Sequence, residues 1–117
     1  MARLSTHVLD TSRGKPAAGV IVHVYRVHGE ARSSLATATT NADGRTDAPL
    51  VSADRLETGT YELTFQVGDY FRRAGVALTD PPFLDTVVIR IGIADAGGSY
   101  HVPLLISPYG YSTYRGS

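Results

Sequence analysis

Two histidines and one arginine carry side chains whose chemistry would suit hydrolysis: His7, His101 and Arg45. An imidazole with a pKa near neutrality can take a proton from water and return it, and a fixed guanidinium stabilises developing negative charge. Together the three groups could hydrolyse a reactive amide. A structural interpretation stays open for both histidines, because a strand histidine more often makes a structural hydrogen bond than it catalyses. We interpret His23 and His28 as structural.

The end of the chain concentrates hydrogen-bonding groups where a terminus normally frays. Four of the seven tyrosines fall in residues 100–117, close to His101. We therefore expect the segment 112–117, which contains Tyr114 and Ser117, to be fixed in a site.

Composition excludes several classes of function. The 117 residues are 43% hydrophobic and carry eleven basic and eleven acidic side chains, so neither a nucleic-acid nor a membrane partner is expected. Without cysteine, and with histidines at no short spacing, the chain lacks the pattern of a metal site. Motifs for phosphate binding, zinc proteolysis and serine hydrolysis are missing too, and we predict no cofactor. The N-terminal residues contain no apolar run, so we expect a cytoplasmic protein.

Alternating apolar and polar residues, separated by turn formers, predict the elements that must position these side chains. Strands are expected over 4–9, 20–25, 33–40, 60–67, 84–93, 99–106 and 109–114. One short helix is expected over 70–74, with Asp69 as its N-cap. Residues 48–59 are expected to form a loop with at most a strand fragment. The pattern predicts one all-β domain over 1–117, a two-sheet β-sandwich of about eight strands.

Local patterns also indicate where two of the candidate side chains point. On the first strand, Ser5, His7 and Leu9 share one face. The turn at 41–44, Asn-Ala-Asp-Gly, reverses the chain immediately before Arg45, because these residue types tolerate the backbone angles of tight turns.

Five segments resemble a known family: LSTHVLD at 4–10, GKPA at 14–17, TNADGR at 40–45, HVPLL at 101–105 and YRGS at 114–117. Together they resemble 5-hydroxyisourate hydrolase, the transthyretin-related enzyme of urate breakdown. The resemblance implies a transthyretin-like sandwich and a homotetramer, a dimer of dimers with sites in a channel at the dimer-dimer interface. By position, the family's functional residues fall on His7, Arg45, His101, Tyr114 and Ser117. Arg115 and Gly116 complete the tail as positioning residues.

The resemblance implies that 5-hydroxyisourate is the substrate and that water attacks its C6 carbonyl. The N1–C6 amide bond then opens to give 2-oxo-4-hydroxy-4-carboxy-5-ureidoimidazoline. His7 and His101 would handle protons, and Arg45 would hold the oxyanion. Tyr114 would orient substrate or water, and Ser117 with its carboxylate would fix an imidazole or a ring N–H. Which histidine is the base stays open.

Two other classes of function compete with this hypothesis. A binding protein of the transthyretin type would use the same channel for a hydrophobic ligand, and its histidines would be structural. A monomeric sandwich module would need no channel, and the Asn-Ala-Asp-Gly turn alone is compatible with it. The polar character of His101 and of the 114–117 tail favours a polar heterocycle over a hydrophobic ligand.

Overall fold

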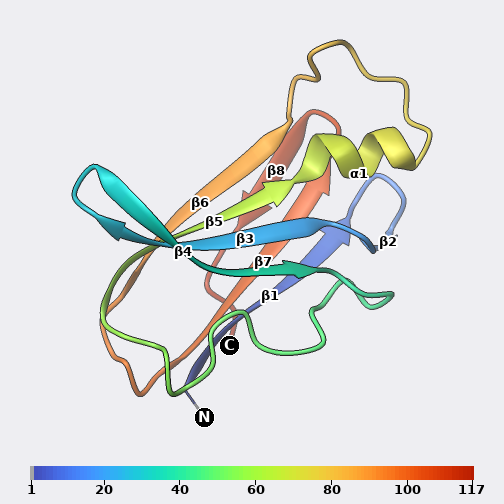
Figure 1. The fold of residues 1–117 in the computed structure, drawn as a ribbon. Coiled ribbons are helices and arrows are strands. Elements are labelled where there is room, and N and C mark those ends of the chain that lie inside the picture. Colours follow the sequence, from blue (N-terminus) through green and yellow to red (C-terminus); the bar gives the residue numbers. More distant parts are fainter. Residues whose placement is uncertain (1) are drawn as a thin grey trace.

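Two four-stranded sheets form the architecture of the computed structural model, which describes residues 2–117 (Figure 1). The first has the order β2-β1-β7-β8, with strands Lys15–Pro16, Arg3–Asp10, Ser99–Ser107 and Gly110–Thr113. The second has the order β4-β3-β5-β6, with strands Ala31–Thr39, Ile21–His28, Gly59–Gln66 and Thr86–Ile93. Residues 2–117 contain one helix, α1 (Val67–Arg73), and the predicted two-sheet β-sandwich of about eight strands is confirmed.

The hydrophobic core lies between the sheets and gives β1 and β7 two different faces. On β1, Leu4 and Val8 are fully buried, whereas Ser5 and His7 are only half-buried. Alternate strand residues point to opposite sides of a sheet, so the half-buried pair lies on the outer face. His101 on β7 is half-buried in the same way, between buried neighbours. The outer face of this sheet therefore carries the candidate histidines.

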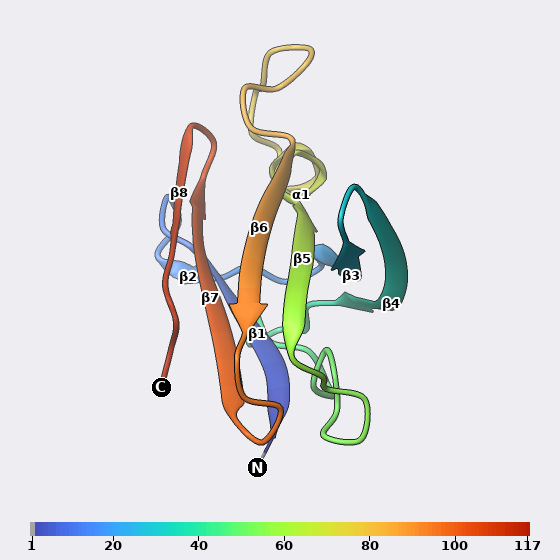
Figure 2. The same cartoon turned by 90° about the vertical axis from the view of Figure 1, so that its left-hand side faces the viewer.

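Parallel pairing of β1 with β7 brings the two ends of the chain together. Ser5 lies opposite His101 in the register, and His7 lies opposite Pro103. Figures 1 and 2 show the N- and C-termini at the same end of the sandwich. Pro103 lies on the inner strand β7. On one side of it along the strand, Leu104 pairs with Thr113 in the β7–β8 ladder, and on the other side His101 forms the isolated bridge with Gly116. The missing N–H of the proline thus falls where the ladder is already interrupted.

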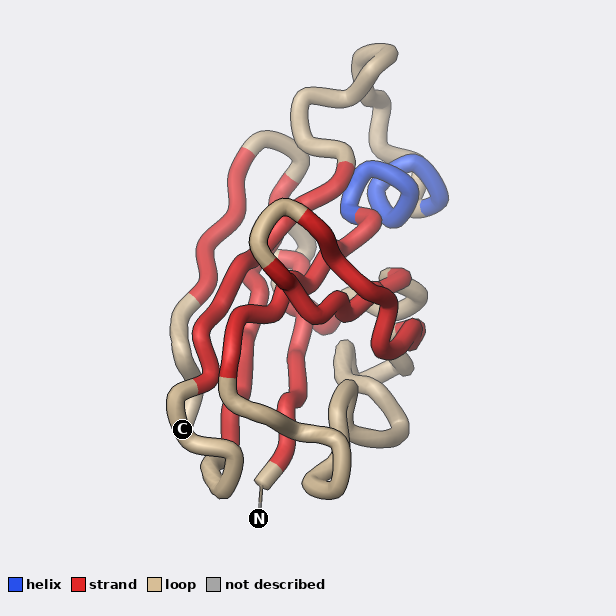
Figure 3. The backbone as a smooth tube through the Cα atoms, turned by 60° about the vertical axis from the view of Figure 1, so that its left-hand side comes forward, coloured by secondary structure: helices blue, strands red, loops and turns tan. Residues whose placement is uncertain are grey.

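The helix begins earlier than the sequence predicted. It starts at Val67, and Asp69 is not its N-cap but lies in the first turn, where its carboxylate accepts a 2.8 Å hydrogen bond from Arg72. The carbonyl of Asp85 accepts from the N–H groups of Val67 and Gly68, so no side-chain cap is needed. The helix lies at the end of the molecule away from both termini (Figure 3). Within residues 2–117 no helix has the length and apolar character required to cross a bilayer.

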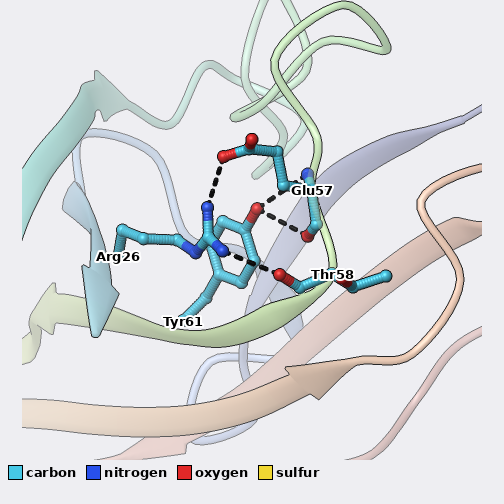
Figure 4. A network of polar contacts seen from close by, with 4 residues as sticks. All are labelled: Arg26, Glu57, Thr58 and Tyr61. Carbon is cyan, nitrogen blue, oxygen red and sulfur yellow. Dashed lines mark hydrogen bonds and ion pairs between the residues drawn. The ribbon is translucent and has the colours of Figure 1, made fainter. Parts of the chain in front are cut away.

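Residues 48–58 form a loop with one strand-like contact, as expected, and Gly59 begins β5. Val51 is buried and exchanges two backbone hydrogen bonds with Leu4 of β1. At the far end of the loop, Arg26 of β3 donates to the Glu57 carboxylate at 2.5 Å and to the Thr58 carbonyl at 2.7 Å (Figure 4). Tyr61 closes the network, since its hydroxyl donates to the Glu57 carbonyl and accepts from the Glu57 N–H. The loop is thus fixed at both ends.

Candidate functional site

Four backbone segments lie side by side across the outer face of the first sheet and carry the candidate residues. Arg45 forms an isolated antiparallel bridge with His7 on one side of β1. On the other side, β1 pairs with β7, which carries His101. The tail follows, because Gly116 forms a bridge with His101. Residues far apart in the sequence thereby occupy neighbouring positions.

The turn before Arg45 depends on one glycine and one asparagine. Gly44 has φ +75°, and its carbonyl accepts a 2.8 Å hydrogen bond from Val8 N–H. A Cβ at this position would lie 2.3 Å from the Val8 carbonyl oxygen, so a larger residue cannot fit without movement. The side-chain oxygen of Asn41 accepts from the N–H groups of Asp43 at 2.9 Å and Arg45 at 3.2 Å. The turn therefore sets the backbone from which Arg45 projects.

The C-terminal tail is attached by backbone and side-chain contacts. Gly116 N–H donates to the His101 carbonyl at 2.8 Å. The Arg115 guanidinium lies 4.1 Å from the centre of the Tyr100 ring and donates to the Ser99 carbonyl at 3.1 Å. These contacts attach the tail to β7, and Arg115 is its side-chain anchor.

A cleft of about 530 Å³ opens on this face. All five residues expected from the sequence line it: His7, Arg45, His101, Tyr114 and Ser117. The rest of its wall comes from the start of β1, the segment after Arg45, and β7 with the tail: Arg3, Ser5, Thr6, Thr46, Asp47, Ala48, Pro49, Ser99, Pro103 and Gly116. The cleft is open in the single chain, where Tyr114 is 61% exposed.

The surroundings favour neutral imidazoles. Burial lowers the pKa of His7 below its usual 6.5, and the positive charge of Arg45 lowers it further. A backbone hydrogen bond to Asp43 and the negative charge of Asp43 raise the pKa, but they offset only part of the lowering. Burial also lowers the pKa of His101, with further contributions from Arg45, His7 and Arg3. Both side chains are therefore unprotonated at neutral pH, the state in which an imidazole can accept a proton from water.

Sequence reasoning missed the side chain that contacts an imidazole most directly. Ser5 Oγ lies 2.8 Å from His101 Nδ1, within hydrogen-bond distance. Its position on the His7 face of the first strand was visible in the alternation, but its partner on β7 was not. Arg3 and the segment 46–49 were also missed, and no sequence signal distinguished them from ordinary polar loop residues.

The arrangement can perform acid-base chemistry next to a fixed positive charge. Two neutral imidazoles, the guanidinium groups of Arg3 and Arg45, and the hydroxyl groups of the tail border the same cleft. Among residues 2–117 no three His, Asp or Glu side chains converge in the way that a metal ion would require. The site offers general bases, an oxyanion partner and hydrogen-bond donors for a polar ligand.

Comparisons with known proteins agree with this geometry. Residues 4–116 match the model of the HIUase/Transthyretin family. The chain is 61% identical to "5-hydroxyisourate hydrolase 2" of Rhizobium meliloti (strain 1021), over 98% of this chain and 96% of that protein. Among solved structures it is similar to 5-hydroxyisourate hydrolase of Klebsiella pneumoniae, with 44% identity, full coverage of both chains and a TM-score of 0.81.

Transthyretin from Sparus aurata shares the fold at 24% identity, with a TM-score of 0.87 over 99% of this chain and 97% of that one. The family model matches nearly the whole sequence, and the hydrolase relatives are 44% and 61% identical to this chain. Identities of this size show more than a shared fold. The chain belongs to the HIUase/transthyretin family.

Proposed function

We propose that this protein hydrolyses 5-hydroxyisourate by opening its N1–C6 amide bond. The observation that carries the proposal is the convergence of His7, Arg45 and His101, from three separate segments, on one polar cleft. The name of the Rhizobium meliloti relative, 61% identical over almost the full length, supports the same substrate.

The first step is the attack of water on the C6 carbonyl carbon. A neutral imidazole, His7 or His101, removes a proton from the water as its oxygen bonds to C6. The carbonyl oxygen gains negative charge, which the Arg45 guanidinium stabilises. When the tetrahedral intermediate collapses, the C6–N1 bond breaks and the imidazolium returns its proton to N1. The product is 2-oxo-4-hydroxy-4-carboxy-5-ureidoimidazoline, formed by the addition of one water molecule.

The tail completes the cleft on the β8 side. Tyr114 and Ser117 line it, and we assign them to substrate orientation. The contact of Gly116 with His101 and the stacking of Arg115 on Tyr100 support this role, because both contacts fix the backbone between the two side chains.

A carrier of hydrophobic ligands, as in transthyretin, is the competing function. Such a carrier calls for an apolar channel, whereas histidine, arginine and hydroxyl groups dominate this cleft. The likeness to Sparus aurata transthyretin extends to the fold alone at 24% identity. Nothing in the cleft favours the carrier over the hydrolase.

The test is to generate 5-hydroxyisourate from urate with a urate oxidase and to follow its ultraviolet decay with and without the protein. We expect a faster decay that is proportional to protein concentration. In water enriched in ¹⁸O, one heavy oxygen should enter the new carboxyl group of the product. Unchanged decay, or a label elsewhere, would overturn the proposal.

We further propose that the working form is a homotetramer in a cytoplasmic setting. The openness of the cleft in one chain supports the assembly, because a second copy facing this sheet would shield the reacting groups and the attacking water from bulk solvent. The location rests on the sequence alone, and cell fractionation would test it.

A further inference from the structure

The ring of His101 is held on two sides by groups from different parts of the chain. Ser5, directly opposite His101 in the parallel register of β1 and β7, places its Oγ 2.8 Å from Nδ1. On another side lies Gly116, where a Cβ would come within 2.7 Å of His101 Cδ2. The Nδ1 atom of the ring therefore contacts the Ser5 hydroxyl, and its Cδ2 atom lies close to the backbone of Gly116.

The second ring nitrogen, Nε2, is left for the cleft. Within residues 2–117, Nε2 has no hydrogen-bond partner, and it is not among the buried unpaired polar atoms. It is therefore accessible to solvent or to a ligand on the side where His101 lines the cleft. Its chemical role depends on which ring nitrogen carries the proton, because a neutral imidazole has one donor and one acceptor.

We infer that Ser5 is a positioning residue that accepts the Nδ1–H of His101 and so presents Nε2 as a proton acceptor in the cleft. A serine hydroxyl can accept or donate, so the charges around His101 decide between the two directions. Arg3 and Arg45 line the same cleft as His101, and their guanidinium groups can only donate hydrogen bonds. In a cleft that carries these two positive groups, an Nε2 lone pair is favoured over an Nε2–H. The catalytic consequence rests on the proposed hydrolase function, but the tautomer does not.

The tautomer can be measured without substrate. Protein labelled with ¹⁵N-histidine, compared with its His101→Asn variant to assign the signals, gives long-range ¹H–¹⁵N spectra that distinguish Nδ1–H from Nε2–H. We expect His101 to be an Nδ1–H imidazole in the unaltered chain at neutral pH. In Ser5→Ala the population should shift toward Nε2–H, and Ser5→Thr, which keeps the hydroxyl, should restore Nδ1–H.

Kinetics with 5-hydroxyisourate give the second readout. Loss of one neutral hydrogen bond predicts a fall in kcat of about 2- to 10-fold for Ser5→Ala with KM almost unchanged, and a recovery in Ser5→Thr. Ser33→Ala, the same substitution on the exposed β4 strand of the other sheet, is the matched control and should leave kcat unchanged.

An Nε2–H tautomer in the unaltered chain, or a tautomer that Ser5→Ala does not alter, would overturn the inference. A fall in kcat that Ser5→Thr does not reverse would remove the positioning role as well. If the unaltered chain fails to accelerate 5-hydroxyisourate decay, the proposed function falls, and the spectra still decide the direction of the Ser5–His101 hydrogen bond.

Discussion

His7 and His101 differ in what surrounds their rings, although both have a lowered pKa. For His7 the neighbouring carboxylate and backbone of Asp43 oppose part of the lowering, whereas for His101 every charged neighbour, including His7 itself, adds to it. The two imidazoles cannot both be protonated without repulsion. At most one of the two imidazoles is therefore expected to carry a proton as the pH falls towards their lowered pKa values.

The pH profile tests this electrostatic account. Because both pKa values are lowered from 6.5, the imidazoles stay neutral at pH 7, and kcat/KM should fall only on acidification below about 6.5. Removing the charge in Arg45→Gln should raise both pKa values and move the acid limb of the residual activity to higher pH. Arg72→Gln, on α1, is the matched control and should leave the limb in place. A limb that Arg45→Gln does not move would contradict the account.

At the scale of elements, alternation in the sequence predicted most strands, and the residue types at 41–44 predicted the turn before Arg45. It could also place Ser5 and His7 on one face, because a strand's period of two is a local property. It could not show that the first strand pairs in parallel with β7, since that contact joins residues 96 positions apart and depends on the packing of both sheets. The contact between Ser5 and His101 was therefore invisible until the register was known.

The helix start was mispredicted for a related reason. Aspartate is a favoured N-cap residue, and this preference suggested a start at Tyr70. Burial of Val67, Tyr70 and Phe71 and the carbonyl of Asp85 instead fix the start at Val67. Tertiary packing outweighs local capping preference here. The tail was predicted from its tyrosines, whereas its attachment through Arg115 and Tyr100 required the structure.

Gly44 should be the most sensitive position of the turn that carries Arg45. Gly44→Ala places a Cβ against the Val8 carbonyl and forces a non-glycine residue to φ +75°. We expect a loss of unfolding free energy of about 2–4 kcal/mol, measured by chemical denaturation, and a larger proportional loss of kcat/KM as Arg45 is displaced.

Gly14→Ala provides the matched comparison for Gly44→Ala. Gly14 has φ +64° but open space around its Cβ position, so the substitution should cost only the backbone strain of about 1–2 kcal/mol. Equal costs at Gly14 and Gly44 would show that the close approach to Val8 does not matter.

Arg115 should control activity through the tail. Arg115→Lys keeps the charge but removes the planar group that stacks on Tyr100 and reaches the Ser99 carbonyl. Because a misplacement of about 1 Å can cost up to about 100-fold in rate, we expect kcat/KM to fall by up to that factor with little change in thermal stability. Arg32→Lys, which disrupts a similar 4.0 Å stacking on Tyr25 in the other sheet, should retain activity. Equal effects of the two variants would argue against a specific role for the tail.

At the scale of the whole molecule, the cleft is lined by residues from both ends of the chain, among them Arg3 and Ser117. Two aromatic side chains at the turn between β7 and β8 and at the start of β8, Tyr109 and Tyr111, are 65% and 46% exposed. The edge strands β6 and β8 also have one side without a partner strand in the single chain. These features support an assembly that covers the edges and encloses the cleft.

Solution mass tests the assembly. A homotetramer would have a mass near 50 kDa, four times the 12.5 kDa of one chain, in light scattering coupled to size-exclusion chromatography. Association should persist upon dilution to the concentrations used in activity assays. A 12.5 kDa species with full activity would remove the need for partner chains at the site.

The rate of 5-hydroxyisourate decay in three single variants tests the central claim most directly. His7→Asn, His101→Asn and Arg45→Gln should each fold like the unaltered protein and lower kcat by about 100- to 1000-fold, the range for loss of a general base or an oxyanion partner. His23→Asn and Arg55→Gln, away from the cleft, should keep full activity. If the three cleft variants retain the rate of the unaltered protein, the reaction does not occur at this cleft and the account is wrong.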